Sequence, residues 1–199
     1  MIKKIKKYRI NIRPSYAFRE AKKRVPAEAH LSEEELEKKV DEAINKSLDK
    51  IVPSSLYVSY SKPETPEPLE PLWQGASKQA ITLSVIISTI GIGIEQNLEQ
   101  ARLNNDLVWE SLLQAVARES LEQCNNFVLR LIEEECKEDN CELSASAPIS
   151  QELLKLTLAQ LDSGKADIIM NEDGVIFPQF TSAFCCFWMS HAKKHAKVS

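Results

Sequence analysis

Long hydrophobic runs are missing from this sequence of 199 residues. A membrane-spanning helix needs about 18 or more consecutive apolar residues, and no stretch of that kind occurs, so we expect no membrane partner. The basic opening Met-Ile-Lys-Lys-Ile-Lys-Lys has no apolar stretch behind it and does not fit a secretory signal. These absences favour a cytoplasmic location.

Cysteine is sparse as well, and the odd count of five predicts reduced thiols rather than a disulfide framework. Cys185 and Cys186, together with His191 and His195, suggest a soft metal site if the tail is helical. Adjacent cysteines in a strand point to opposite faces, however, and no set of four ligands has zinc-site spacing. We therefore predict buried apolar thiols and no metal site.

The motifs of several enzyme classes are absent, including the G-x-S-x-G elbow of hydrolases and the P-loop of nucleotide-binding proteins. Gly91 and Gly93 follow a predicted strand, as in a dinucleotide-binding loop, but position 96 is Gln, so the full G-x-G-x-x-G is lacking. A tight turn into a helix is the simpler interpretation, and the helix N-terminus would be free to accept an anion. We predict no catalytic residues, and the motifs alone identify no enzyme.

Positive charge is concentrated at the start of the chain. Residues 1–24 carry ten Lys or Arg and one Glu, which is +9, so the remaining residues sum to −13 in a chain of net charge −4. A basic arm can bind nucleic acid, anionic lipid or an acidic protein surface, and a transit segment is a further alternative. No aromatic pattern for base stacking accompanies the charge. We therefore favour an arm, residues 1–30, that lies on the acidic surface of its own domain, residues 31–199, and no nucleic-acid partner.

Hydrophobic periodicity predicts an alternation of helices and strands. Ser32 and Glu35 have capping-box spacing and begin a helix over 31–52. Asp106 is a plausible N-cap for a long helix over 106–136, and Ser150 for a shorter one ended by Gly164. A further helix begins near residue 95. Strands are expected over 55–60 and 80–88, with a hairpin over 168–177, and a further apolar run covers 184–189.

Two connections lack this periodicity. Residues 62–71 contain four prolines and are predicted to be an extended, stiff surface segment. Residues 137–149 are polar and predicted to be irregular. The whole pattern indicates an α+β fold: a single domain with a mostly antiparallel, twisted sheet packed by helices, one of them long and central.

Two stretches of this sequence together carry a resemblance to a known family. The first is Thr-Ile-Gly-Ile-Gly-Ile-Glu at 89–95, followed by Asn105-Asp106 and the apolar helix at 112–122. The second comprises Met-Asn-Glu at 170–172, Ile-Phe-Pro at 176–178, Thr-Ser-Ala at 181–183 and Phe-Trp-Met-Ser-His at 187–191. In this order they resemble the S-adenosylmethionine-binding reactivation domain of cobalamin-dependent methionine synthase, most of all its short, free-standing members. The resemblance runs from about residue 31 to about residue 195.

The resemblance implies a role in positioning rather than in acid–base chemistry. The family's domain docks on a cobalamin-binding domain and holds S-adenosylmethionine over the corrin for reductive reactivation. This chain would then be an accessory protein of a corrinoid methyl-transfer system, with a corrinoid-binding protein or methyltransferase as partner and cobalamin carried by that partner. By resemblance, the residues expected near S-adenosylmethionine are Glu122, Thr89, Gly91, Glu95, Pro178 and Ser182. Among them, Glu122 matches a family glutamate suited to the amino group of the donor.

The sequence departs from the family where the donor's carboxylate should be held. The family has an R-x-x-P-G-Y segment between the long helix and the next one, whereas residues 141–148 here contain no Arg, Gly or Tyr. Losing an arginine that faces a carboxylate weakens binding strongly, unless Arg130 or a lysine replaces it. The alternative function is a non-catalytic protein-interaction module that retains the fold only.

Overall fold

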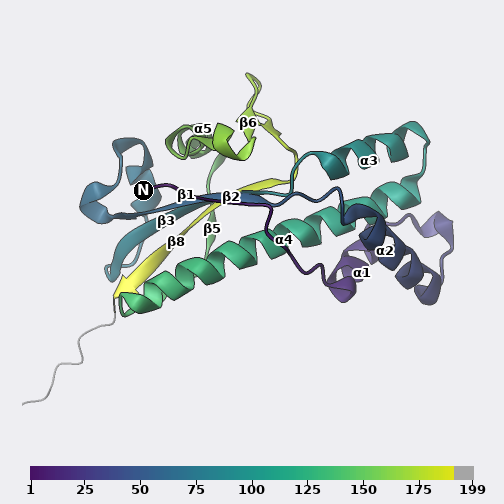
Figure 1. Ribbon diagram of the computed structural model, residues 1–199, viewed down its shortest axis with the longest axis horizontal. Helices are drawn as coiled ribbons and strands as arrows, with labels where there is room; N and C mark the ends of the chain where they lie inside the picture. The colour runs from purple at the N-terminus through teal and green to yellow at the C-terminus, as the bar shows by residue number, and fades with distance from the viewer. Residues whose placement is uncertain (191–199) are drawn as a thin grey trace, which may run out of the picture.

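The computed structural model describes residues 1–190, and its architecture confirms the expected α+β fold with an antiparallel sheet and one long central helix (Figure 1). The α-helices are α1 (Pro14–Lys22), α2 (Glu33–Ser47), α3 (Gly93–Leu103), α4 (Leu107–Glu138) and α5 (Gln151–Gln160). The strands are β1 (Lys3–Lys6), β2 (Ser54–Ser61), β3 (Ala80–Thr89), β4 (Cys141–Leu143), β5 (Ala147–Pro148), β6 (Ile169–Met170), β7 (Ile176–Phe177) and β8 (Thr181–Ser190). Short 3-10 helices are η1 (Ala27–Ala29), η2 (Lys62–Glu64), η3 (Glu67–Trp73) and η4 (Ser163–Ala166).

Local sequence signals set the starts of two major helices. In α2, the Ser32 hydroxyl accepts the Glu35 amide while the Glu35 carboxylate accepts the Ser32 amide, which is the predicted capping box. The Asp106 carboxylate accepts the Trp109 amide at 2.9 Å and begins α4, as expected. α2 ends at Ser47, earlier than the predicted residue 52. Neither α4 nor any other described helix combines the length and hydrophobicity needed to cross a bilayer.

The main sheet has the order β1-β2-β3-β8-β4. β5 pairs with the same strand, β8, further along it than β4 does, at Phe184 and Cys185. All of these pairings are antiparallel. α4 crosses one face of the sheet, and α5 with the β6–β7 hairpin covers the other (Figure 1). This two-sided cover explains the nearly continuous hydrophobicity of β3, because both of its faces are buried.

Alternation along each strand divides the core in two. On β2, Leu56 and Val58 join the cluster beneath α5, whereas Tyr57 joins the cluster beneath α4. On β8, Cys185 and Cys186 also belong to opposite clusters, as predicted for adjacent cysteines in a strand. All five cysteines are buried, free thiols.

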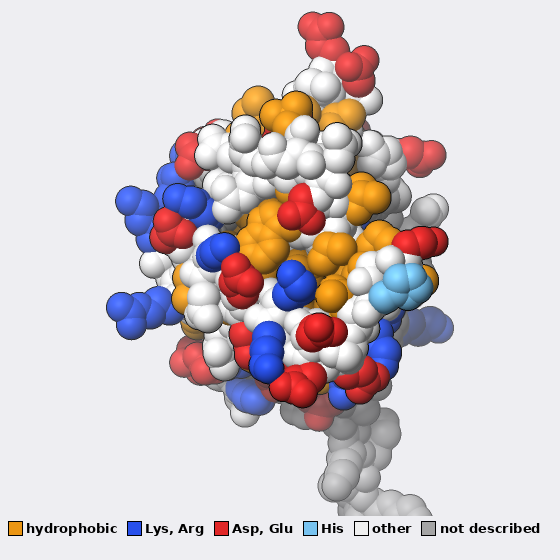
Figure 2. Space-filling view, turned by 90° about the vertical axis from the view of Figure 1, so that its right-hand side faces the viewer, with side chains coloured by type: hydrophobic (Ala, Val, Ile, Leu, Met, Phe, Trp, Pro, Cys, Tyr) orange, Lys and Arg blue, Asp and Glu red, His pale blue; other side chains and the backbone are white. Residues whose placement is uncertain are grey.

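A third cluster forms away from the sheet, where α1, α2 and α3 surround the first half of α4. Small side chains allow these helices to approach closely, and the fully buried ones include Ala17, Ala21, Ala43, Ala115 and Ala117. Figure 2 looks onto this end of the molecule and shows hydrophobic side chains gathered at its centre, surrounded by lysines, arginines and acidic residues.

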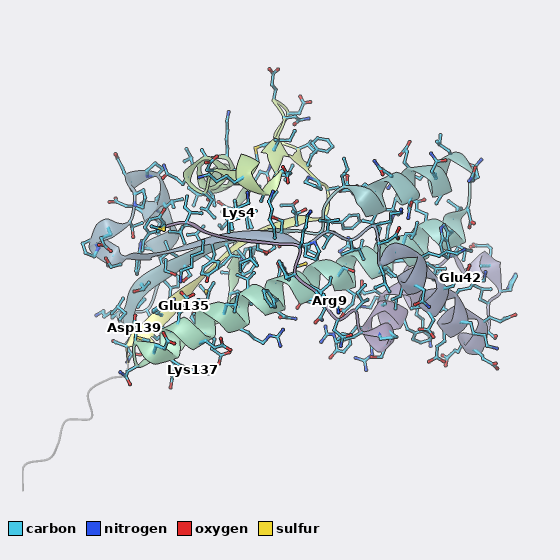
Figure 3. The ribbon with its side chains drawn as sticks, in the orientation of Figure 1. Lys4, Arg9, Glu42, Glu135, Lys137 and Asp139 are labelled. Carbon is cyan, nitrogen blue, oxygen red and sulfur yellow. The ribbon has the colours of Figure 1, made fainter. Side chains whose placement is uncertain are left out.

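The first 30 residues supply β1 and α1, and both elements contact the rest of the protein. Lysines of β1 point to both sides of the sheet, because Lys3 and Lys6 are an odd number of residues apart: Lys3 pairs with Glu135 on α4, while Lys6 pairs with Asp167 beside α5. Figure 3 labels Lys4 and Glu135 on these two sides. The basic segment therefore contacts carboxylates of its own chain, which is the interpretation that its charge pattern favoured.

Two predictions about connections were wrong. The proline-rich segment 62–71 is not extended but forms η2 and most of η3, with Leu69 fully buried against the α5 side of the core. Proline is compatible with the first positions of a short helical turn because no intrahelical donor is needed there. Residues 137–149 are not irregular throughout, because the open edge of β8 gives β4 and β5 backbone partners that their own sequence does not reveal.

Candidate functional site

The six residues expected at the site do not converge on a single cavity. Thr89, Gly91 and Pro178 line a cavity of about 770 Å³ on the α5 side, here called the end cavity. Glu122 lines a pocket of about 560 Å³ between α1 and α4, here called the α1 pocket. Glu95 and Ser182 line neither.

The glycine turn is explained by the chain packed against it. Gly91 has a φ of +79°, which favours glycine, and a Cβ there would lie 3.2 Å from the Val52 carbonyl oxygen. A Cβ on Gly93 would lie 2.3 Å from the Lys50 carbonyl oxygen, which is sterically impossible without a backbone shift. Both glycines therefore serve the close approach of residues 50–52, in agreement with the tight-turn interpretation.

Thr89 and Glu95 hold the segment that follows β7. The Thr89 hydroxyl donates to the Phe180 carbonyl at 3.2 Å and accepts the Gly91 amide. The Glu95 carboxylate accepts the amides of Gln179 and Phe180. Burial raises the pKa of the Glu95 carboxyl, and the two amide hydrogen bonds partly offset that rise. These contacts position residues 178–180 relative to α3.

Ser182 of β8 contacts α4, the helix that carries Glu122. The Ser182 hydroxyl donates to the Asn125 side-chain oxygen at 2.7 Å and so joins β8 to α4. Asn125 and the exposed Glu122 both line the α1 pocket. Ser182 is thus connected to the pocket of Glu122 through one side chain, which the sequence could not indicate.

An ion pair that the sequence does not indicate lines the α1 pocket. Arg13 donates to both carboxylate oxygens of Glu119, at 2.7 and 3.2 Å, and Glu119 is only 4% exposed. The Tyr16 ring lies 3.6 Å from the Arg13 guanidinium. The hydrogen bonds to Glu119 raise the pKa of Arg13. No sequence signal predicts this pair, because its members are 106 positions apart.

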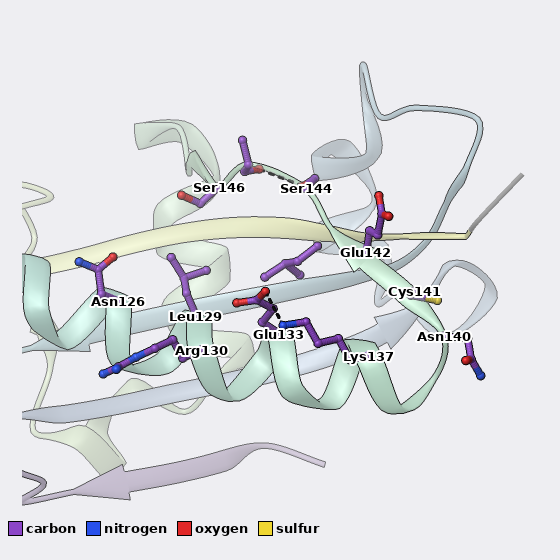
Figure 4. Close-up of a pocket in the computed structure, with 12 residues that line it drawn as sticks. Asn126, Leu129, Arg130, Glu133, Lys137, Asn140, Cys141, Glu142, Ser144 and Ser146 are labelled. Atoms are coloured by element: carbon purple, nitrogen blue, oxygen red, sulfur yellow. Dashed lines mark hydrogen bonds and ion pairs between the residues drawn. The ribbon is translucent and has the colours of Figure 1, made fainter.

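A groove of about 900 Å³ lies between the second half of α4 and residues 140–146, and it is here called the α4 groove. Figure 4 shows Glu133 and Lys137 paired on α4, at 2.8 Å, and the segment carrying Ser144 and Ser146 on the opposite side. The Arg130 side chain runs back along the helix toward the turn of Asn126. Arg130 is exposed.

The α4 groove brings Arg130 together with residues 141–146, which lie apart in the sequence. Residues 141–146 belong to the interval where the resembled family carries its arginine motif, and Arg130, named as its possible replacement, lines the same groove. Steps of four place Glu122, Asn126 and Arg130 along one face of α4. Asn126 donates to Glu122 at 3.5 Å. A search for polar side chains at i, i+4 and i+8 would have found this row.

No group of three or more His, Cys, Asp or Glu in residues 1–190 is arranged to hold a metal ion. His191 and His195, which were considered as possible ligands, lie outside the described residues. Burial raises the pKa of the Cys124 and Cys186 thiols to about 12, which suits inert core cysteines rather than metal ligands or nucleophiles.

Comparison with known proteins gives a likeness in structure only. No family model matches the sequence, and no curated protein matches it. A solved structure described as "Crystal Structure of the MetH Reactivation Domain bound to AdoHcy" has the same fold, with a TM-score of 0.62. The match covers 97% of this chain and 80% of that chain at 12% sequence identity. The fold expected from the family resemblance is therefore confirmed over nearly the whole chain.

Proposed function

We propose that this chain is an accessory protein of cobalamin-dependent methyl transfer, which docks on a corrinoid-binding protein or methyltransferase. The observation that supports this most is the likeness to the MetH reactivation domain over 97% of the chain, including the long central helix. A fold alone does not fix a function, so the proposal also depends on the chemistry that the α4 groove offers.

The α4 groove suits the amino-acid end of an S-adenosyl compound. Such an end carries a carboxylate and an ammonium on one carbon, so it needs a cation and an anion a short distance apart. Arg130 would hold the carboxylate, and Glu133, one turn further along α4 in the same groove, would supply the anion for the ammonium. Glu122, which the resemblance offers for the ammonium, lines the α1 pocket instead and lies about 12 Å from Arg130 along the helix axis.

The segment opposite α4 supplies a different surface from the family's motif. Leu143 and Ala145 give it apolar side chains, and Ser144 and Ser146 give it hydroxyl groups. Leu129 adds an apolar side chain from the helix. These residues can enclose the rest of the ligand and exclude water, but they offer no second charge for its carboxylate. Of the two cations that line the groove, Lys137 is paired with Glu133 at 2.8 Å, so Arg130 carries the binding of that group.

The role of this chain would be to bind and orient. When bound, S-adenosylmethionine would supply the methyl group, and cobalamin would come with the partner protein. Arg130 and Glu133 would fix one end of the donor, so that its sulfonium end is presented outward from the groove toward the partner. No proton transfer by a side chain is required, in accord with the absence of catalytic motifs from the sequence.

The test is calorimetric titration of the purified chain with S-adenosylmethionine, followed by titration with a cobalamin-loaded corrinoid protein. We expect saturable binding of both. Arg130→Ala should weaken donor binding about tenfold or more, because it removes a charge-assisted hydrogen bond. Arg130→Lys should restore part of the loss. Arg102→Ala serves as the matched control, since Arg102 is an exposed arginine of α3 paired with Glu110.

The outcomes separate the two functions. Docking on the corrinoid protein without donor binding would leave the protein-interaction module. Equal donor binding by the Arg130→Ala and Arg102→Ala variants would reject the α4 groove as the donor site. Failure of both titrations with the unaltered chain would overturn the corrinoid role itself.

A further inference from the structure

The end cavity has no place in the role proposed for α4, because it lies on the opposite, α5 side of the sheet. It forms where β3 ends and α3 begins, and the β6–β7 hairpin and η4 close its far side. The residues lining it include Lys6, Lys7, Lys50, Ser54, Thr89, Gly91, Ile92, Gly93, Ile169, Phe177 and Pro178.

One wall of the end cavity is a row of side chains across three strands. Lys6 of β1 stands opposite Ser54 of β2, and Ser54 stands opposite Thr89 of β3. Directly opposed residues on antiparallel strands point to the same face of a sheet. All three residues line the cavity, so the row presents an amine and two hydroxyl groups to it.

The hydroxyl in the middle of this row has no partner. Ser54 is 5% exposed, and its Oγ makes no hydrogen bond within the described residues. Its neighbours differ: the hydroxyl groups of Ser55 and Ser88 are bonded to each other at 2.9 Å, and those of Ser59 and Ser84 at 2.7 Å. An unsatisfied buried hydroxyl costs about 1–3 kcal/mol. Its presence in a cavity wall points to an acceptor that the protein itself does not supply.

The N-terminus of α3 faces the same space. The helix has 11 residues, its N-cap is Ile92, and no side chain caps its first turn. The leading amides of a helix have no acceptor within the helix, and the dipole makes this end favourable for negative charge. Ile92 and Gly93 line the cavity, so this end of the helix lies at its edge, whereas the Gly91 amide already donates to the Thr89 hydroxyl.

Of the three lysines that line the end cavity, two are paired with carboxylates, which leaves the third to balance the charge of a ligand. Lys6 pairs with Asp167 at 2.9 Å and Lys50 with Asp49 at 2.8 Å, so both lining carboxylates are already held. Lys7 also lines the cavity, and its amine has no carboxylate partner within residues 1–190. The lining therefore carries a net positive charge in a chain whose total is −4.

The rest of the cavity is apolar. Ile92, Ile169 and Phe177 are all more than two-fifths exposed, which is unusual for three large apolar side chains that line one cavity. Pro178 and Pro53 add flat surfaces beside them. A ligand that matches this lining has an apolar body and one charged end.

We propose that the end cavity binds a small amphipathic anion, a carboxylate or phosphate carried on a flat apolar group. The oxyanion accepts hydrogen bonds from the Ser54 hydroxyl and the first turn of α3, and Lys7 balances its charge. The apolar body lies against Phe177 and Ile169. This site shares no lining residue with the α4 groove, so the test of anion binding here does not depend on whether the groove binds the methyl donor.

Nuclear magnetic resonance of the ¹⁵N-labelled full chain can test this, because the chain has only five glycines. Gly91, Gly93 and Gly164 line the cavity, whereas Gly75 and Gly174 do not and act as internal controls. The probes are phenyl phosphate and benzoate, with neutral benzyl alcohol for comparison. We expect both anions to shift the Gly91 and Gly93 amide signals saturably. The relative affinities of the two anions identify the preferred oxyanion.

Variants complete the test. Ser54→Ala should weaken binding of the anionic probes about tenfold, the value of a hydrogen bond to a charged group, and Lys7→Ala should weaken it to a lesser degree. Lys78→Ala removes an exposed lysine that is not in the cavity and should change nothing. The proposal is overturned if no anion shifts these signals, if benzyl alcohol shifts them equally, or if Ser54→Ala and Lys7→Ala bind as the unaltered chain does.

Discussion

The two halves of α4 lie in different surroundings, although they form one continuous helix. The first half is enclosed by α1, α2 and α3, and Leu112, Leu113 and Val116 are almost completely buried there. The second half packs on the sheet through Val128 and Ile132 and leaves its other side to the α4 groove. One half is thus mainly a source of stability, and the other combines packing with a surface for ligands.

The largest effect on stability is expected in the enclosed half. Leu113 is 0% exposed, so Leu113→Ala should lower the free energy of unfolding by about 2–5 kcal/mol through lost burial and a residual cavity. Leu129→Ala, in the half-exposed part of the same helix, should cost clearly less. Urea unfolding of both variants measures the difference. Equal losses would show that the halves are not packed differently.

The ion pair at the α1 pocket gives the next comparison. Glu119→Gln removes the charge that the Arg13 guanidinium meets in a largely buried position, and it should shift the urea midpoint downward. Glu122→Gln changes an exposed carboxylate one turn away and should barely affect the midpoint. Indistinguishable midpoints for the two variants would contradict a structural role for the Arg13–Glu119 pair.

The loss of stability at alkaline pH should also differ between the two halves of α4. Burial raises the pKa of the Cys124 thiol to about 12, and that of Cys136, near the end of α4, to about 11. An unfolded thiol has a pKa of about 8.5, so the unfolded chain loses its proton first, and stability falls as the pH rises above that value. Cys124→Ala should flatten this fall more than Cys136→Ala. Urea midpoints at neutral and alkaline pH check the order.

The smallest effect on stability is expected in the α4 groove. Arg130 is exposed, so Arg130→Ala should change the free energy of unfolding by no more than about 0.5 kcal/mol. The same variant is expected to lose most of its affinity for the methyl donor. A large loss of stability with unchanged donor binding would reverse the roles assigned to the two halves.

Local signals in the sequence predicted much of the fold. The Ser32 capping box, the Asp106 N-cap and the apolar strand over 80–88 each act within a few residues, so the chain around them does not change their meaning. The proline-rich segment was misjudged because the burial of Leu69 depends on α5, which is distant in sequence. β4 and β5 were missed for a similar reason, since their hydrogen bonds come from β8.

The candidate site was less predictable than the fold. The resemblance selected Thr89, Pro178 and Glu122 for one ligand, but the first two line the end cavity and the third lines the α1 pocket. The spacing of residues along the chain does not show on which face of a sheet a loop will pack. The row from Glu122 to Arg130 was readable in principle, because a helix repeats its face every three to four residues.

The sequence by itself determined the α+β class, the long helix and the turn at Gly91, because these follow from periodicity, capping and the freedom of glycine. Only the tertiary structure decided which polar groups share a cavity. Ser54 and Lys7 come together with α3 through antiparallel strand pairing and a turn, and Arg130 meets residues 141–146 because β4 pairs with β8. Such contacts depend on register and on which face is covered, and both are properties of the packed chain.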